Sequence, residues 1–200
     1  MQSGDAADVL LKWANSGIGW LLGAAVVYDP ASKQAGIVIG APGAGKTSLG
    51  YALTRQGIRV LGDDTPTFLL FEQGRLFAFG DLLLHRYVIS RGPFQQKTYR
   101  IPPSTEFVPV QFAVFLDDEP GVKEPRLIAN MPPHAVDEIA VAPEAVATQY
   151  MTALSRLPTW HFGAHRFPTV SEGQLVGEAA LIRSWLAAGA PTEWSPLQSD

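Results

Sequence analysis

Residues 40–47 read Gly-Ala-Pro-Gly-Ala-Gly-Lys-Thr, a complete G-x-x-x-x-G-K-[ST] phosphate-loop motif. Its glycines allow successive main-chain N–H groups to turn inward around a polyphosphate. The lysine of such a loop contacts the β- and γ-phosphates, and the hydroxyl that follows it ligates Mg²⁺. We therefore expect Lys46 and Thr47 to fill these two roles. The motif thus predicts that a nucleotide binds here through its phosphates. The residues predicted to bind it are Gly40, Ala41, Pro42, Gly43, Ala44, Gly45, Lys46, Thr47 and Ser48.

The sequence on either side of the motif has the order that a phosphate loop requires. Residues 36–39 form a short apolar, β-branched run, which predicts a buried strand. Residues 46–56 read as a helix with Leu49 and Leu53 on one face, and Gly57 is typical of the left-handed residue that ends a helix. The alternative is a glycine-rich turn that binds nothing, but such a turn has no need of Lys-Thr at this spacing.

Two carboxylates follow the next predicted strand. Asp63 lies 17 residues past Lys46, and Asp64 is beside it, directly after the apolar run 58–61. If this run and strand 36–39 are parallel, their carboxyl ends lie at the same edge of a sheet. One carboxylate would then help to hold Mg²⁺, and the other would accept a proton from an attacking hydroxyl. The alternative is a turn in which both aspartates bond to the main chain.

The remaining pattern predicts a single α/β domain over residues 1–200, with a mixed or mostly parallel sheet flanked by helices. The predicted strands are 20–28, 36–39, 58–61, 110–116 and 159–167, with a hairpin at 67–79. The predicted helices are 5–13, 46–56, 143–157 and 172–188. Four prolines between 92 and 109 indicate a long irregular loop. The acidic run 117–119 precedes a Pro-Gly pair, which favours a solvated turn over a metal cluster.

Composition excludes several classes of protein. The chain has no cysteine, so disulfides, thiolate zinc sites and cysteine nucleophiles are excluded. The formal net charge is −4, whereas nucleic-acid binding needs a basic surface, and we expect no nucleic-acid partner. No apolar run approaches the roughly 20 residues that span a bilayer. The N-terminus lacks the order of a signal peptide. We expect a cytoplasmic protein with no membrane partner.

Taken together, the motifs resemble the kinase domain of HPr kinase/phosphorylase and its relatives, which share a core with phosphoenolpyruvate carboxykinases. The resemblance rests on the run from Gly40 through Thr-Ser-Leu, the helix after it, and Gln-Gly-Ile-Arg-Val-Leu-Gly-Asp-Asp at 56–64. It is firm over residues 20–72 and looser over 110–190. It implies ATP and Mg²⁺ as cofactors. It also implies Asp63 as the general base and Asp64 as the metal carboxylate, with the two roles open to exchange.

The resemblance implies an ATP-dependent phosphotransferase that moves the γ-phosphoryl group to a hydroxyl of a protein, a peptide or a small molecule. The relatives commonly carry a histidine on the strand before the loop, where Leu22 or Gly23 stands here. A nucleotide-binding regulatory protein without transfer activity therefore stays open as an alternative, as does a nucleoside triphosphatase that acts as a switch. The sequence is compatible with a homo-oligomer and does not define the acceptor.

Overall fold

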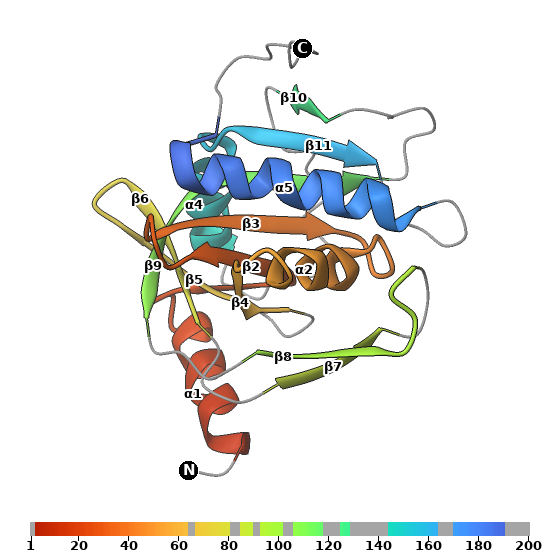
Figure 1. The fold of residues 1–200 in the computed structure, drawn as a ribbon. Helices are drawn as coiled ribbons and strands as arrows, with labels where there is room; N and C mark the ends of the chain where they lie inside the picture. The colour runs from red at the N-terminus through yellow and green to blue at the C-terminus, as the bar shows by residue number, and fades with distance from the viewer. Residues whose placement is uncertain are drawn as a thin grey trace.

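The computed structural model describes residues 3–63, 67–80, 85–89, 93–101, 106–117, 125–128, 144–163 and 170–190. Its helices are α1 (Ser3–Asn15), α2 (Lys46–Thr54), α4 (Glu144–Ser155) and α5 (Glu172–Ala188). Its strands are β1 (Trp20–Leu22), β2 (Ala24–Asp29), β3 (Gln34–Gly40), β4 (Arg59–Gly62), β5 (Thr67–Glu72), β6 (Arg75–Phe79), β7 (His85–Ile89), β8 (Lys97–Ile101), β9 (Phe107–Asp117), β10 (Arg126–Ile128) and β11 (Thr159–Gly163). The fold is mixed α/β, as the sequence predicts (Figure 1).

Nine of the described strands form one mixed sheet, with the long strand β9 at its centre. One edge of β9 pairs in parallel with β3. Its other edge pairs with β6 through residues 107–109 and with β11 through residues 113–117. Beyond β3 lie β2 and then β4, each joined by an antiparallel ladder, so β4 runs in the same direction as β3. The carboxyl ends of β3, β4, β9 and β11 therefore lie along one edge, which we call the carboxyl edge.

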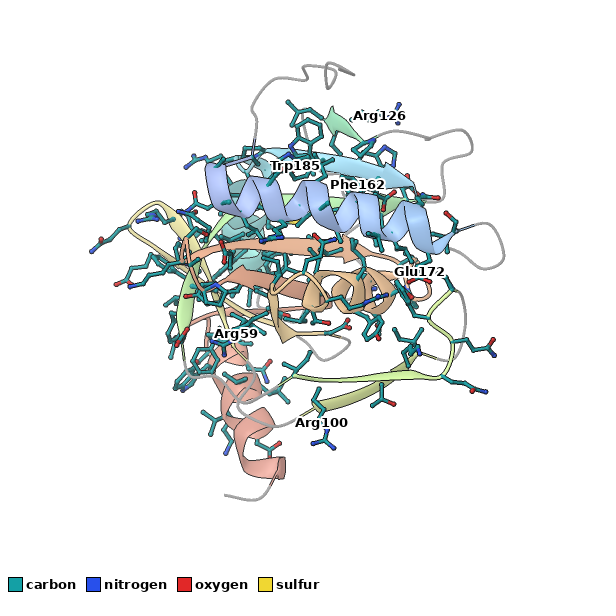
Figure 2. The ribbon with its side chains drawn as sticks, viewed as in Figure 1. Arg59, Arg100, Arg126, Phe162, Glu172 and Trp185 are labelled. Atoms are coloured by element: carbon teal, nitrogen blue, oxygen red, sulfur yellow. The ribbon has the colours of Figure 1, made fainter. Side chains whose placement is uncertain are left out.

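Helices α2 and α5 cover one face of this sheet (Figure 1). Trp160 and Phe162 of β11 are buried on this face, and their rings lie 4.6 and 5.8 Å from the ring of Trp185 in α5. Figure 2 labels Phe162 and Trp185. Phe112 of β9 adds a third ring at 5.7 Å from Trp185. Side chains two apart on a strand share a face, which is why β11 can present two aromatic rings to one helix. This cluster anchors α5 on the sheet.

Helix α4 packs on the opposite face of the sheet. Its Tyr150 and Leu154 are buried in a cluster that includes Ile37 and Ile39 of β3 and Phe115 of β9. The main-chain N–H of β5 at position 71 donates a hydrogen bond of 3.0 Å to the Tyr150 hydroxyl oxygen. Burial raises the pKa of Tyr150 above its ordinary value, so the phenol is neutral at physiological pH. Tyr150 thus ties α4 to the sheet through both its ring and its hydroxyl.

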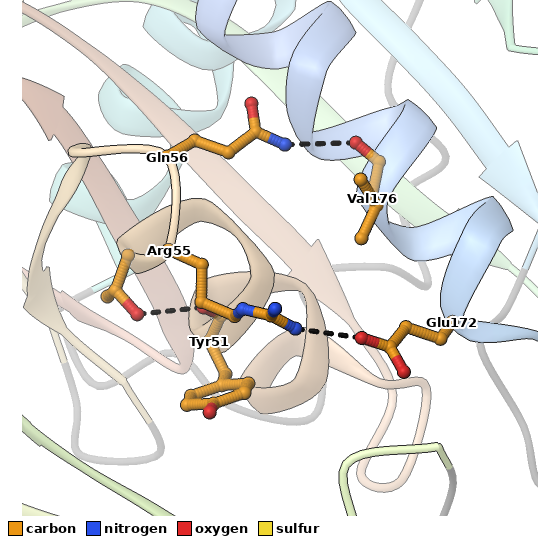
Figure 3. A network of polar contacts seen from close by, with 6 residues as sticks. Tyr51, Arg55, Gln56, Glu172 and Val176 are labelled. Atoms are coloured by element: carbon orange, nitrogen blue, oxygen red, sulfur yellow. Dashed lines mark hydrogen bonds and ion pairs between the residues drawn. The ribbon is translucent and has the colours of Figure 1, made fainter.

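Polar contacts join the end of α2 to the first half of α5 (Figure 3). Arg55 donates from Nη1 to Glu172 Oε1 at 2.8 Å, and Gln56 donates from Nε2 to the carbonyl oxygen of Val176 at 3.0 Å. The predicted helix stop at Gly57 has φ 86°. The two helices that cover the same face are therefore also tied to each other.

Most of the predicted elements are present. The hairpin expected at 67–79 consists of β5 and β6, and its two-residue turn has positive φ at Gln73 and Gly74, as a type I′ turn requires. Helix α5 has the predicted bounds 172–188, and α2 matches the predicted 46–56 except for its last two residues.

Two predictions were wrong. The single strand expected at 20–28 is two strands, because the chain changes partner at Gly23: β1 pairs with β5, whereas β2 pairs with β3. The irregular loop expected at 92–109 contains β8 and the start of β9. Pro109 is the last residue of β9 that pairs with β6, and the ladder with β3 on the opposite edge begins one residue later, so this proline lies at the end of one ladder and outside the other. The predicted strand residues beyond 163 lie outside the described residues.

Strands β7 and β8 form a hairpin apart from the main sheet, below it in Figure 1. Phe94 in the connection is 1% exposed, and its ring lies 4.9 Å from that of Tyr51 in α2. Three residues of β8, Lys97, Thr98 and Arg100, are exposed. The sequence pattern does not reveal this strand because its exposed polar residues obscure the alternation that marks a half-buried strand.

Candidate functional site

The loop between β3 and α2 owes its shape to three glycines. Gly43 and Gly45 have φ values of 81° and 102°. This left-handed conformation costs other L-residues roughly 1–2 kcal/mol. Gly40 meets a different demand, because a Cβ there would lie 2.8 Å from the carbonyl oxygen of Leu116 in β9. Main-chain geometry and the close approach of a neighbouring strand therefore explain the glycines of the motif.

Helix α2 begins at Lys46, directly after the left-handed Gly45. No side chain caps its first turn, and no acidic residue lies in that turn. The first N–H groups of a helix lack acceptors within the helix and carry a partial positive charge. Ala41, Pro42 and Gly43 before it are exposed to solvent. This helix end therefore favours a negatively charged group that approaches from solvent.

Lys46 is folded over the loop that precedes it. The residue is 9% exposed, and its Nζ donates hydrogen bonds of 2.7 and 3.2 Å to the carbonyl oxygens of Gly40 and Ala41. Thr47 and Ser48 follow in the first turn of α2, both partly buried. A phosphate oxygen would be a stronger acceptor for the ammonium than these neutral carbonyls, because charge-assisted hydrogen bonds are roughly twice as strong. An anion in the loop can therefore draw Lys46 away from the main chain.

Asp63 directly follows β4 at the carboxyl edge, and it is fully buried. Strand β2 separates β4 from β3, so Asp63 lies two strands from the loop, about 10 Å across the sheet. Asp64, predicted as a metal ligand, lies outside the described residues. The structure therefore describes one member of the predicted carboxylate pair, Asp63, and its side chain is not accessible to solvent.

A second polar group at the carboxyl edge escapes the sequence pattern. Asp117 ends β9, and His161 of neighbouring β11 has its Nε2 3.6 Å from Asp117 Oδ2. Arg126 of β10 donates from Nε to His161 Nδ1 at 3.1 Å, and Figure 2 shows it beyond β11. Asp117 therefore belongs to a strand and not to the predicted turn, of which 118–119 lie outside the described residues. The sequence signal that could have placed Asp117 at the end of a strand is the apolar run 112–116, which Asp117 directly follows.

No preformed metal cage is present among the described residues, where no three His, Asp or Glu side chains are grouped to hold an ion. Mg²⁺ does not need such a cage, because it keeps several waters and takes one or two carboxylates together with substrate phosphates. A magnesium ion at the carboxyl edge would therefore depend on a bound nucleotide.

Each helix that the structure describes is too short or too polar to cross a bilayer.

No family model matches the sequence, and no curated protein matches it. Among solved structures, 23 chains match, and one of them is an HPr(Ser) kinase/phosphatase from Coxiella burnetii. The two chains are 14% identical with a TM-score of 0.49, and the match covers 82% of this chain and 94% of that one. The likeness is one of fold, at a level that carries no conclusion about activity. The function therefore has to follow from the residues of this chain.

Proposed function

We propose that the protein binds ATP in the loop 40–47 and transfers its γ-phosphoryl group to a hydroxyl acceptor. The observation that carries this proposal is the conformation of the loop, with left-handed φ at Gly43 and Gly45 between a buried strand and an uncapped helix start. Such a loop directs main-chain N–H groups toward one point, which is how proteins hold phosphate groups. Lys46 adds a positive charge at the same place.

The proposed reaction moves one phosphoryl group and one proton. The acceptor oxygen forms a bond to the γ-phosphorus, the bond to the β–γ bridging oxygen breaks, and ADP leaves. The hydroxyl proton passes to a carboxylate, for which Asp63 is the candidate. Lys46 and the loop N–H groups would offset the phosphate charge and position the triphosphate, which supplies most of the rate in such transfers. Mg²⁺, held by Thr47 and Asp64, would neutralise the β- and γ-phosphates.

The burial of Asp63 favours a second candidate function, nucleotide binding without transfer. A general base must come within hydrogen-bond reach of the hydroxyl it deprotonates, directly or through one water. Asp63 has 0% exposure, so its carboxylate meets this condition only if the residues that cover it move. Nucleotide binding makes no such demand, because the loop lies at the surface.

The binding step is tested by the variant Lys46→Ala. We expect the wild-type protein to bind ATP, and Lys46→Ala to weaken that affinity about 10- to 100-fold, because a charged hydrogen bond to phosphate contributes about 1.5–3 kcal/mol. Isothermal titration calorimetry with ATP and Mg²⁺ measures the affinity. Lys12→Ala on α1 removes the same charge from an exposed site and should leave the affinity unchanged. Wild-type protein that is folded and gives no heat with ATP would rule out the proposal.

The transfer step is tested with [γ-³²P]ATP and pools of serine-containing peptides or small alcohols. Transfer to an acceptor, lost in Asp63→Asn while ATP binding is retained, supports the kinase. ATP binding without transfer or hydrolysis supports the regulatory protein. Steady hydrolysis of ATP or GTP without an acceptor, abolished by Lys46→Ala, supports a triphosphatase switch.

A further inference from the structure

The β7–β8 hairpin lies in a stretch of the chain with a local excess of positive charge. Residues 82–105 contain no aspartate or glutamate, and their basic residues are Arg86, Arg91, Lys97 and Arg100. The whole chain, by contrast, has a formal net charge of −4. Among the described strands, β7 and β8 pair only with each other. The hairpin is therefore a basic ribbon on an acidic protein.

The two faces of this hairpin differ in burial. Ile101 of β8 is 0% exposed, and together with Ile89 and Phe94 it belongs to the core cluster that includes the apolar residues of α2. Thr98 and Arg100 are exposed. Adjacent residues of a strand lie on opposite faces, so these two share the face that Ile101 does not. Figure 2 shows Arg100 on the side of the hairpin away from the main sheet. We call the face with Thr98 and Arg100 the basic face.

Two arginines are directly opposite each other in the register of the hairpin. Arg86 of β7 pairs with Arg100 of β8. The β5–β6 hairpin instead pairs Glu72 with Arg75, which have opposite charges. Like charges directly opposite on neighbouring strands are destabilising, whereas opposite charges stabilise the pair. An anion bound at the arginine pair would offset this repulsion, so the basic face favours a negatively charged ligand.

The dimensions of the basic face suit a short peptide. Strand β8 has 5 residues, which extend about 17 Å. Proteins that bind nucleic acid often neutralise about six to ten phosphates, and the net charge of −4 opposes such binding. An extended peptide can pair with the edge of a hairpin, and its alternate side chains then lie on one face. Carboxylates at alternate positions would meet guanidinium groups, which bind them with two parallel hydrogen bonds.

The hairpin is also joined to the helix that follows the phosphate loop. The ring of Phe94 lies 4.9 Å from that of Tyr51, and the Arg55 guanidinium carbon lies 5.9 Å from the Phe94 ring centroid. Tyr51 is about 8 Å along α2 from Lys46. A partner on the basic face is therefore held by a ribbon that packs on the same helix as the loop.

We propose that the basic face docks an acidic, extended segment of the protein that carries the acceptor hydroxyl. The positive charge at the Arg86–Arg100 pair attracts carboxylates of this segment, and an edge of the hairpin holds its main chain. The assignment of the partner as the acceptor rests on the proposed function, whereas the docking itself needs no nucleotide. The acceptor is thereby narrowed to a protein with an acidic docking segment.

Docking is tested by fluorescence anisotropy, with a fluorescein-labelled peptide in which Glu and Ser alternate, at low salt and without nucleotide. We expect the wild-type protein to bind this peptide, and added NaCl to weaken the binding. Arg100→Gln should weaken it about fivefold, because the lost contact is an exposed ion pair. Arg75→Gln removes the same charge from an exposed position of the β5–β6 hairpin and should leave the affinity unchanged. A peptide with Gln in place of Glu should not bind.

Arg100→Glu separates docking from a structural role. The change replaces a like-charged cross-strand pair by an oppositely charged one, so the urea midpoint of unfolding should rise. The affinity for the acidic peptide should nevertheless fall more than about tenfold, because the new charge repels the carboxylates. A purely structural role would move stability and binding in the same direction. A lower urea midpoint would contradict the repulsion on which the proposal rests.

Other results would overturn the proposal. Wild-type protein that binds ATP but not the acidic peptide contradicts the docking alone, as does equal peptide affinity in Arg100→Gln. Tighter binding of a single-stranded oligonucleotide than of a peptide of equal charge would assign the basic face to nucleic acid. Wild-type protein that binds the peptide but no ATP contradicts the proposed function and the acceptor assignment, and leaves the docking intact.

The acceptor assignment has its own measurement. With [γ-³²P]ATP and the acidic serine peptide, Arg100→Gln should raise KM about fivefold and leave kcat unchanged, because a docking residue contributes equally to the ground state and the transition state. Arg75→Gln should change neither constant. An unchanged KM in Arg100→Gln would show that the acceptor does not use the basic face.

Discussion

Gly40, Gly43 and Gly177 differ in the physical reason for having a glycine at each position. A Cβ at Gly40 would collide with the main chain of β9. Gly43 has open space around it but a φ of 81°, and Gly177 has open space inside α5 with no such φ. Glycine in a helix interior raises the conformational entropy of the unfolded chain and adds no stabilising contact to the folded one. The first two positions therefore require glycine, and the third does not.

The change of glycine to alanine is expected to have opposite effects at two of these positions. Gly43→Ala should lower the free energy of unfolding by about 1 kcal/mol, because the left-handed conformation is sterically unfavourable for alanine. Gly177→Ala should raise it by about 0.5–1 kcal/mol, because the helix interior is better suited to alanine. Urea unfolding followed by circular dichroism measures both. A loss of stability in Gly177→Ala would contradict the account of that site.

At the scale of elements, the start of α5 is held by two different polar contacts. The Ser171 hydroxyl oxygen accepts a hydrogen bond of 3.1 Å from the N–H of Gln174, which is a helix cap. Glu172 forms the ion pair with Arg55, and both of these side chains are 52% exposed. A cap satisfies an N–H group that has no other acceptor in the helix, whereas an exposed ion pair is weakened by water and salt. The cap should therefore contribute more to stability.

Variants of these two neighbours should separate the contributions. Ser171→Ala is expected to cost about 1 kcal/mol of unfolding free energy at any salt concentration. Glu172→Gln should cost less than about 1 kcal/mol, and the cost should shrink in 0.5 M NaCl. Urea unfolding at low and high salt measures both. A larger, salt-independent effect for Glu172→Gln would show that the ion pair is more important than its exposure indicates.

Elements with a regular local pattern could be predicted from the sequence. The hairpin at 67–79 has a turn that only a few residue pairs suit, and the boundaries of α5 follow from the Ser171 cap and the periodic apolar residues after it. The loop 40–47 was predictable because its motif is contiguous in the sequence and Gly43 and Gly45 are required by local main-chain geometry, although Gly40 is required by the neighbouring strand β9. The position of Asp117 beside the loop was not predictable, because it depends on the order of the strands in the sheet, which local spacing does not specify.

At the scale of the whole molecule, the aromatic cluster under α5 joins elements that are distant in the sequence. Trp185 is 4% exposed, and its ring contacts side chains of both β9 and β11. Truncating a buried Trp to Ala typically costs about 3–5 kcal/mol, which is a large share of the 5–15 kcal/mol that stabilises a typical domain. Loss of this one ring therefore threatens the whole fold.

Trp185→Ala is expected to lower the free energy of unfolding by about 3–5 kcal/mol. Trp13→Ala removes the same ring from α1, where the residue is 40% exposed, and should cost less than half as much. Chemical denaturation followed by far-ultraviolet circular dichroism compares the two. Equal losses would indicate that α1 is as important to the fold as α5.

The pairing of Gly40 with Leu116 also has a consequence for the order of events during synthesis. The two residues are 76 positions apart, so a growing chain contains the complete glycine-rich motif long before the strand that braces it has left the ribosome. Contacts of such long sequence separation form late in folding, because a large loop must close first. The observed shape of the loop is therefore a late acquisition, and the nascent N-terminal half has to persist without the contact between Gly40 and β9.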